Sequence, residues 1–230
     1  MADSMELTMF ERLLLLPLFH GLNFRDISEI MSHVKLHFIN YQAGDEIVMQ
    51  GDSCRKIIYV INGKIATEYR DPYDRFTYYE NHEKLDIIEP YNLFGMQLKY
   101  SRTYSFLTNG TTLSVDKQVF VNTILNHSMV RSNILNLVCN KYQKTLAIAT
   151  QQPDGTVMEK IVKFFMTYAT EVKGEKRLKI KMNDIADIVH EPRLNVSKAL
   201  NTLDDSGLIK IQRGIIHIPE LLQLKELTTK

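Results

Sequence analysis

A stretch without proline or glycine, from Lys117 to Thr150, constrains the fold of this chain more than any other feature of its sequence. Proline and glycine commonly end helices, so their absence over this length predicts a long helix. Along its second half, apolar side chains recur at steps of one, three and four residues. They are Val130, Ile134, Leu137, Val138, Tyr142, Leu146 and Ala149. Such a stripe is typical either of a seam between two copies of the helix or of a core helix packed on its own domain, and the length favours the seam.

The residues before this stretch follow a strand pattern. Between Pro17 and Val34 the apolar spacing predicts short helices, with Asn23 as an N-cap. Beyond Lys35, brief β-branched and aromatic runs are separated by glycine or acidic turns. These runs are HFINY, DEIVMQGD, KIIYVINGKIATEYR, FTYYEN, KLDIIEP and YSFLTNGTTLSVD. Many short strands at this spacing predict a sandwich or a barrel-like roll of about a hundred residues.

A second unit is expected after the sequence QQPDG, because the proline and glycine there end the long helix. We therefore predict a domain boundary near residue 152. Beyond it, the pattern indicates a helix over 158–168, a strand at RLKIKM, two helices, a hairpin at GLIKIQRGIIHIP that turns at Arg213 and Gly214, and a closing helix over 220–227. The predicted class is α+β, with a β-roll over 1–116, a long helix over 117–151 and a C-terminal unit over 152–230.

The two central helices of the second unit have the pattern of a helix–turn–helix. Asn183 is placed to cap the first helix, and Pro192 suits the first position of the second, after a turn at His190 and Glu191. Gly207 follows the second helix where a left-handed residue commonly ends one. The predicted inner sides are apolar and consist of Ile185, Ala186, Val189, Val196, Ala199, Leu200 and Leu203. With the following hairpin, this is the layout of a winged helix, which sets its second helix in the major groove of DNA.

The outer side of that second helix carries side chains suited to base edges and phosphates. They are Arg193, Leu194, Asn195, Ser197 and Lys198. Arginine pairs bidentately with guanine, lysine with guanine or phosphate, asparagine and serine with either bases or phosphate, and leucine contacts a thymine methyl group. A solvated polar face on an ordinary three-helix packing is the alternative. Double-stranded DNA is favoured by the hairpin and by a nearby basic cluster, Lys173, Lys176, Arg177, Lys179 and Lys181.

Composition excludes several classes of protein without selecting one. The 28 basic and 27 acidic residues give a formal net charge of +1, so any contact with nucleic acid must come from a local patch. Cys54 and Cys139 have no paired spacing that would suggest a metal site or a disulfide framework, and a reducing cytoplasm is the simplest setting. The apolar run from Leu13 to Leu16 is too short to span a membrane. We expect a cytoplasmic protein without a membrane segment.

Nearly the whole chain, from about Pro17 to Pro219, resembles the Crp/Fnr family of transcription regulators. At the front the resemblance rests on PLFHGL and on YQAGDEIVMQGDSCRKIIYVINGKI, with family-like residues at Gly44, Gly51, Asp52, Tyr59 and Gly63. At the back it rests on RLNVSKALNTLDDSGLI. It implies a cyclic-nucleotide-binding-like jelly roll, a dimerisation helix and a winged helix-turn-helix that reads DNA through Arg193 and Lys198. Leu194 departs from the acidic residue that many members carry there, so we expect a different target sequence.

The resemblance also implies partners and a control site. It implies a bacterial homodimer on a near-palindromic operator, with RNA polymerase as a candidate partner and a small effector bound to the β-roll. Val130, Ile134, Leu137, Val138 and Tyr142 would line the dimer interface. Half-sites about one helical turn apart, roughly 34 Å, are expected for such a dimer.

The effector site would lie in the stretch PYNLFGMQLKYSRTYSF. Family members that bind cyclic nucleotides hold the ribose with a glutamate and the cyclic phosphate with an arginine. Phe94 and Gly95 match, and Arg102 and Thr103 are placed for the phosphate, but Met96 replaces the glutamate and cannot usefully accept its hydrogen bond. We therefore do not expect cyclic AMP, and we assign an unidentified effector to these five residues. A plain surface role for Arg102 is the alternative.

No cofactor, metal or enzymatic site is predicted. An iron–sulfur sensor needs about four cysteine ligands, and the chain has two cysteines. Haem ligands are present by residue type only, at His20, His33, His37 and His82, which we interpret as surface or core histidines. The sequence has no nucleophile elbow, phosphate loop or metal-ligand spacing. The remaining alternative to a regulator is a scaffold that binds an effector or a partner, without the salt-sensitive operator binding of a DNA-binding protein.

Overall fold

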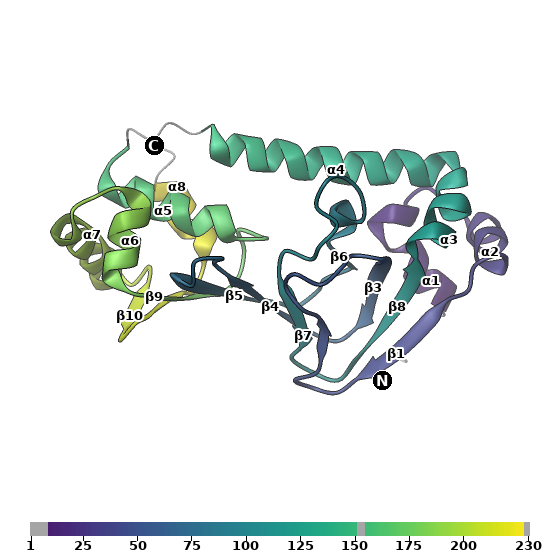
Figure 1. Ribbon diagram of the computed structural model, residues 1–230, viewed down its shortest axis with the longest axis horizontal. Helices are drawn as coiled ribbons and strands as arrows, with labels where there is room; N and C mark the ends of the chain where they lie inside the picture. Colours follow the sequence, from purple (N-terminus) through teal and green to yellow (C-terminus); the bar gives the residue numbers. More distant parts are fainter. Residues whose placement is uncertain (1–8, 151–154, 228–230) are drawn as a thin grey trace, which may run out of the picture.

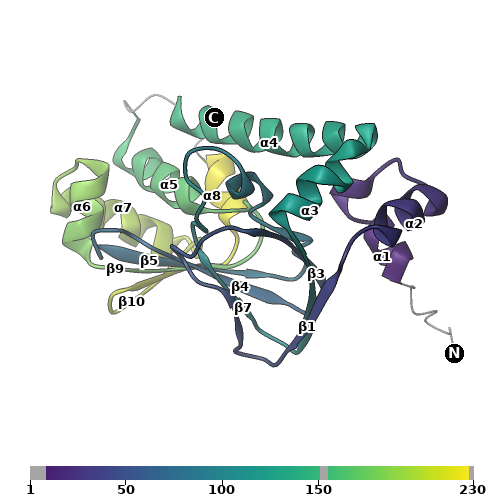
Figure 2. The same ribbon diagram turned by 45° about the vertical axis from the view of Figure 1, so that its right-hand side comes forward.

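The computed structural model describes residues 9–150 and 155–227. Figure 1 shows a strand-rich N-terminal part, a long helix along one side of the molecule, and a group of C-terminal helices at the far end. In Figure 2, turned by 45°, the long helix remains on the same side of the strands. The molecule is α+β, as the sequence predicts.

The N-terminal strands form two antiparallel layers. One sheet has the order β1 (His37–Tyr41), β8 (Gly110–Asp116), β3 (Lys56–Asn62) and β6 (Ile87–Ile88). The other contains β2 (Glu46–Val48), β7 (Thr103–Phe106), β4 (Ile65–Arg70) and β5 (Phe76–His82). Every predicted run contributes a strand. Gly63 and Gly110 allow the ring of Phe106 to lie close to the β3–β4 turn, because a Cβ at Gly63 would be 2.7 Å from that ring.

Short helices cover the start of the β-roll. They are α1 (Met9–Leu14), the 3₁₀ helix η1 (Pro17–Phe19) and α2 (Phe24–Ser32). Asn23 caps α2 as predicted, since its side-chain oxygen accepts from the backbone N–H of Arg25 and Asp26 at 2.9 and 3.0 Å. The Asp26 carboxylate accepts in return from the Asn23 N–H at 3.0 Å, which completes a capping box.

The predicted single helix over 117–151 is wrong in one respect. The chain instead forms α3 (Lys117–Asn122), the 3₁₀ helix η3 (Ile124–Asn126) and then α4 (Ser128–Ala149). His127 adopts an extended backbone conformation and separates η3 from α4. The break seats Phe120 and Ile124, both fully buried, in the core of the β-roll before the longer helix departs. The predicted boundary near residue 152 lies outside the described residues.

The C-terminal unit has the predicted order of elements. It consists of α5 (Val157–Tyr168), β9 (Lys176–Ile180), α6 (Met182–Val189), α7 (Arg193–Asp205), β10 (Lys210–Gln212), β11 (Ile215–Ile218) and α8 (Leu221–Leu227). The predicted cap at Asn183 is wrong: α6 begins at Met182 with Lys181 in the N-cap position, because β9 ends directly before it at Ile180. Pro192 is the N-cap of α7 rather than its first residue.

A single sheet joins the two units, which the sequence did not predict. Its order is β10-β11-β9-β5-β4-β7-β2, so the strands of the C-terminal unit continue the sheet of the β-roll. β9 pairs antiparallel with β5, from Phe76 opposite Ile180 to Glu80 opposite Lys176. Phe76 and Tyr78 of β5 are buried with the apolar core of the C-terminal helices. Among the described residues, no helix combines the length and apolarity needed to cross a membrane.

Candidate functional site

Helix α7 packs by one side only. Val196, Leu200 and Leu203 are fully buried against the rest of the C-terminal unit, and Ala199 is partly buried there, as the sequence predicts. Gly207, at φ +73°, ends the helix in the left-handed conformation that glycine adopts without strain. The inner residues of α6, Ile185, Ala186 and Val189, are also buried as predicted.

The other side of α7 is exposed. Arg193, Leu194, Asn195 and Lys198 are exposed, and Ser197 is half-buried. Within the described part of the chain, Arg193 and Lys198 form no ion pair that would neutralise them. Two free cations, two hydrogen-bonding side chains and one apolar side chain therefore share the first two turns of a helix whose other side is anchored. This surface can contact phosphates and base edges.

The turn and the hairpin hold α7 in place. His190 lies in the left-handed region at φ 53° and ends α6, while the Glu191 carboxylate pairs with Lys160 of α5 at 2.5 Å. β10 and β11 form the predicted hairpin, with Gln212 opposite Ile215 and the turn at Arg213 and Gly214. Lys210 and Arg213 are exposed on this hairpin. Exposed cations thus occur both on α7 and on the hairpin.

The basic cluster predicted beside α7 is only partly available to a ligand. Lys176 is buried, and its ammonium pairs with Glu80 of the β-roll at 3.2 Å. The guanidinium of Arg177 stacks over the ring of Tyr79, 4.6 Å from its centroid. The prediction that Lys176 belongs to a basic cluster for DNA is corrected, because its buried ion pair with Glu80 connects the C-terminal unit to the β-roll.

The five predicted effector residues do not converge. Met96 is fully exposed and Phe94 is partly exposed, with the Lys117 ammonium over its ring at 5.4 Å. Gly95 has φ +91°, which only glycine adopts freely. The hydroxyl of Thr103 accepts from the backbone N–H of Gln50 at 3.0 Å. Phe94 and Thr103 thus contact different partners, Lys117 and Gln50.

Glu89, which the sequence analysis missed, organises the loop between β6 and β7. Its buried carboxylate accepts from the Asn92 amide at 2.6 Å, from the Ser101 N–H and hydroxyl at 2.7 and 2.6 Å, and from the Tyr104 hydroxyl at 3.1 Å. Four donors to one carboxylate satisfy its burial. They tie the start of the loop, including η2 (Pro90–Leu93), to its end. A lone glutamate before a proline gives no sequence signal for such a role.

Among the five residues predicted to bind an effector, Arg102 differs most from its predicted position. It is buried, and its guanidinium pairs with Glu80 at 3.4 Å, donates to the backbone carbonyl of Tyr168 at the end of α5, and lies over the ring of Tyr69 at 5.4 Å. The plain surface alternative is therefore wrong. Arg102 connects the loop of the β-roll to the C-terminal unit.

Glu80 is the centre of this joint and was also missed. Its side chain has no exposed surface, and its carboxylate pairs with both Arg102 and Lys176 and accepts from the Thr170 N–H at 2.9 and 3.0 Å. Beside it, the ring of His82 contacts the Thr67 hydroxyl at 3.2 Å. Burial lowers the pKa of His82, against the opposing effect of Glu80.

A second cation lies near the loop between β6 and β7. The ammonium of Lys141, on the half-buried side of α4, is 5.4 Å from the centroid of the Tyr91 ring. Burial, and then the positive charge of Arg102, lower the pKa of Lys141. Glu89 and Glu80 oppose this lowering, so two cations and two carboxylates act on one another between the loop and α4.

Comparison with known proteins identifies the fold. No protein-family model matches the chain, and no curated protein matches it in sequence. A structure from Eubacterium rectale, described as a transcriptional regulator of the Crp/Fnr family, is 18% identical with a TM-score of 0.53, over 93% of this chain and 98% of that one. The chain has the Crp/Fnr fold.

Two other solved structures match the chain over similar lengths. The catabolite activator protein of Thermus thermophilus is 18% identical with a TM-score of 0.49, over 92% of this chain and 98% of that chain. FixK2 from Bradyrhizobium japonicum is 13% identical with a TM-score of 0.47, over 86% and 99% of the two chains.

The long helix of this Crp/Fnr fold presents an apolar stripe that differs from the predicted one. Val130 and Ile134 are 0% and 7% exposed because they pack into the β-roll core of their own chain, so their assignment to a dimer interface is corrected. Leu137 is half-buried. Beyond Met129 in its first turn, the large apolar side chains that α4 exposes lie at helical spacing and are Leu135, Val138, Tyr142 and Leu146.

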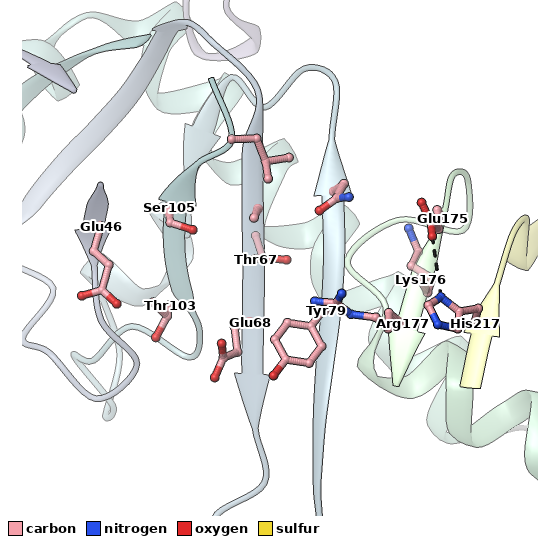
Figure 3. A pocket seen from close by; sticks show the side chains of 13 residues that line it. Glu46, Thr67, Glu68, Tyr79, Thr103, Ser105, Glu175, Lys176, Arg177 and His217 are labelled. Carbon is pink, nitrogen blue, oxygen red and sulfur yellow. Dashed lines mark ion pairs between the residues drawn. The ribbon is translucent and has the colours of Figure 1, made fainter. Parts of the chain in front are cut away.

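A hollow of about 390 Å³ lies on the outer face of the shared sheet (Figure 3). Its walls come from both units, with Glu46 and Glu68 on the β-roll side and Arg177 and His217 on the other. The dashed line in Figure 3 joins His217 to Glu175, 3.9 Å apart. Opposite charges are mixed along this face. The groups of three or more acidic, histidine or cysteine side chains that a metal site requires do not occur among the described residues.

Proposed function

We propose that this chain is a homodimeric, sequence-specific DNA-binding regulator of the Crp/Fnr type, controlled by a small effector at the β-roll. The observation that carries the proposal is helix α7, whose exposed Arg193 and Lys198 stand over a fully buried apolar side. A helix anchored in this way and followed by a hairpin is the arrangement that enters a major groove. The fold shared with a Crp/Fnr-family structure supports it.

The roles of the α7 residues follow from their chemistry. Arg193 is proposed to pair with guanine, Leu194 to contact a thymine methyl group, and Asn195, Ser197 and Lys198 to contact bases or phosphates. The exposed hairpin cations Lys210 and Arg213 are proposed to contact flanking phosphates.

The dimer is proposed to form along α4. Leu135, Val138, Tyr142 and Leu146 are exposed and spaced by three or four residues, as in a two-helix seam. A two-fold dimer makes the operator near-palindromic, with half-sites roughly 34 Å apart. The proposed units are a sensing domain over 1–116, a dimerisation helix over 117–151 and a DNA-binding domain over 152–230, in a cytoplasmic bacterial protein that has RNA polymerase as a candidate partner.

The effector is proposed to be a small molecule other than cyclic AMP. Residue 96 is a methionine, whose thioether is too weak an acceptor to hold a ribose hydroxyl as a glutamate would. Arg102 and Lys141 supply positive charge beside the same loop. An anionic group is the chemistry that these two side chains suit.

Selection of bound sequences from a random pool of double-stranded DNA tests the proposed function. The full chain, with and without cyclic AMP, is compared with Arg193→Ala and with Lys84→Ala, which removes an exposed cation from the turn between β5 and β6. We expect a palindromic motif that the wild type and Lys84→Ala share, that Arg193→Ala loses, and that cyclic AMP does not alter. No enrichment with any of these proteins would favour the scaffold interpretation instead.

A further inference from the structure

The outer face of the shared sheet carries a row of side chains that crosses the joint between β5 and β9. Because side chains alternate along a strand, this face is opposite to the one that holds Glu80 and Arg102. In Figure 3 the row runs across the picture, each residue directly opposite the next, and consists of Thr103, Glu68, Tyr79, Arg177 and His217. Directly opposite side chains on one face lie about 5 Å apart. The row therefore places groups of the β-roll beside groups of the C-terminal unit.

The hollow on this face lies where short side chains occupy the middle of the sheet. Two residues along from the row, Ala66 of β4 is directly opposite Ser105 of β7 on one side and Asn81 of β5 on the other. Ser105 in turn lies opposite Glu46 of β2. Longer side chains from β2 and β9 form the two sides. The volume, about 390 Å³, lies within the range of roughly 300–1,000 Å³ that is typical of small-molecule pockets.

The two sides of the hollow carry opposite charges. Within residues 9–150 and 155–227, neither Arg177 nor Glu46 takes part in an ion pair. The Arg177 guanidinium lies over the Tyr79 ring, and this contact leaves its positive charge without a carboxylate. Glu68 pairs with Arg70 at 3.2 Å, but a surface pair of this kind contributes little and exchanges readily. A positive side and a negative side thus face each other across short side chains.

A molecule with both charges suits this arrangement better than a simple ion. An anion at Arg177 would lie near the carboxylates of Glu46 and Glu68, and a cation beside those carboxylates would lie near Arg177. On the Arg177 side, the Glu175 carboxylate lies 3.9 Å from His217. An α-amino acid has a carboxylate, which arginine binds bidentately, and a primary ammonium, which donates to carboxylates and hydroxyls. Its two charged groups match the two sides of the hollow.

We propose that the hollow binds a free α-amino acid across the joint between β5 and β9. The carboxylate of the amino acid pairs with Arg177, its ammonium donates to Glu68 and to the Ser105 hydroxyl, and its side chain lies over Ala66. The site is separate from Arg102, whose side chain lies on the other face of the sheet. The inference goes beyond the proposed function and does not rest on DNA binding.

Calorimetric titration of the full chain tests the binding. L-serine, L-glutamine and L-leucine are the probes, because they share the two charged groups and differ in the side chain. At constant ionic strength, we expect at least one of them to bind with a dissociation constant of about 1 mM or below. Its N-acetyl derivative and its amide each lack one charge and should bind about tenfold more weakly or worse. No binding of the three amino acids, or equal binding of the derivatives, overturns the proposal.

Two variants locate the site, each with a matched control. Arg177→Gln and Glu68→Gln should each weaken binding of the amino acid about tenfold, whereas Lys179→Gln and Glu83→Gln should not. Lys179 is exposed on the same face of β9, outside the hollow. Glu83, in the turn after β5, is an exposed carboxylate that pairs with Lys64 at 2.7 Å. If either hollow variant binds as tightly as its control, the assignment is overturned.

Hydrogen exchange tests whether the bound amino acid spans the two units. Because Arg177 and Glu68 come from different units, the ligand should stabilise the ladder of β9 with β5. At ten times the dissociation constant, exchange of the β9 backbone N–H groups should slow about tenfold, and that of β1 in the other sheet should not change. Slowing in both sheets or in neither overturns a position across the joint.

The failure of this site and the failure of the proposed function are distinguishable. None of the three measurements requires DNA, so a negative sequence selection leaves all of them interpretable. Conversely, the absence of amino-acid binding leaves the recognition of DNA by α7 untouched.

Discussion

The Phe76 end and the Glu80 end of the joint between the two units are neighbours on the same pair of strands, but different forces hold them. The Phe76 end is a cluster of aromatic rings continuous with the core of the C-terminal helices. The Glu80 end is a buried carboxylate shared by two cations and an N–H group. Apolar packing is lost when its surfaces separate, whereas charged groups are rehydrated. The Phe76 end should therefore resist separation of the two units more strongly than the Glu80 end.

Removal of the Phe76 ring should give the largest loss of stability. Phe76 is 3% exposed, so Phe76→Ala removes a buried aromatic side chain and should lower the free energy of unfolding by about 3–5 kcal/mol, measured by urea denaturation. Tyr73→Ala, in the β4–β5 turn, is the control because that side chain is 80% exposed. Similar losses in the two variants would contradict a stabilising role of the aromatic packing at the Phe76 end.

Truncation of Glu80 should give a smaller and more local effect. Glu80→Ala leaves Arg102 and Lys176 buried without their counterion. Separation of the two units at this end would rehydrate both cations and so limit the loss of stability. We expect a loss of about 1–3 kcal/mol at this end. Scanning calorimetry should show the endotherm splitting into two transitions, as the units uncouple. A single transition, lowered as far as that of Phe76→Ala, would show that the two ends do not differ.

The proposed dimer interface on α4 should be independent of both ends of the joint. Leu135→Glu places a charge in the exposed stripe of α4 and should raise the dimer dissociation constant at least tenfold, about 1.4 kcal/mol, in sedimentation experiments. Asn140→Glu, five residues further along the helix and facing away from the stripe, should leave assembly unchanged. A persistent dimer in Leu135→Glu would place the interface elsewhere. Two calorimetric transitions in Leu135→Glu would show that the interface and the joint are not independent.

Acid should lower the stability of the protein through His82, beside Glu80. This is the smallest of the expected effects. Burial lowers the pKa of His82, so the imidazole stays neutral in the folded protein while the unfolded chain takes up a proton below the ordinary pKa of 6.5. Stability should therefore fall as the pH drops below about 6.5, and should not depend on this group above it. The test compares urea midpoints from pH 7.5 to 5.5 for the wild type and His82→Gln. An equal slope in both would exclude His82.

Helix α7 could be predicted from sequence because its signals are local. The apolar period through Val196, Leu200 and Leu203, the stop at Gly207 and the hairpin turn at Gly214 all lie within one short segment. The strands of the β-roll were equally visible as short runs between glycines. Each of these signals depends on only a few neighbouring residues. In the structure the apolar residues of α7 are buried, and the hairpin turns where the sequence predicts.

The joint could not be predicted because its partners are far apart in the sequence. Glu80 sits in the run FTYYEN, where strand alternation alone gives no reason to bury a carboxylate. Its burial depends on Lys176 and Thr170 of the other unit and on Arg102 of the loop. Similarly, the stripe on α4 was misplaced at Val130 and Ile134, because the sequence does not say which side of the helix its own β-roll covers.

The most direct test of the central claim, that α7 reads DNA, is the ratio of affinities for the selected operator and for random DNA, measured at fixed salt by fluorescence anisotropy. If Arg193 pairs with guanine, Arg193→Ala should weaken operator binding by about 1–3 kcal/mol, roughly 5- to 150-fold, and random DNA far less. The ratio then falls by nearly the same factor. An unchanged ratio, with both affinities kept or both lowered equally, would contradict base recognition by this helix.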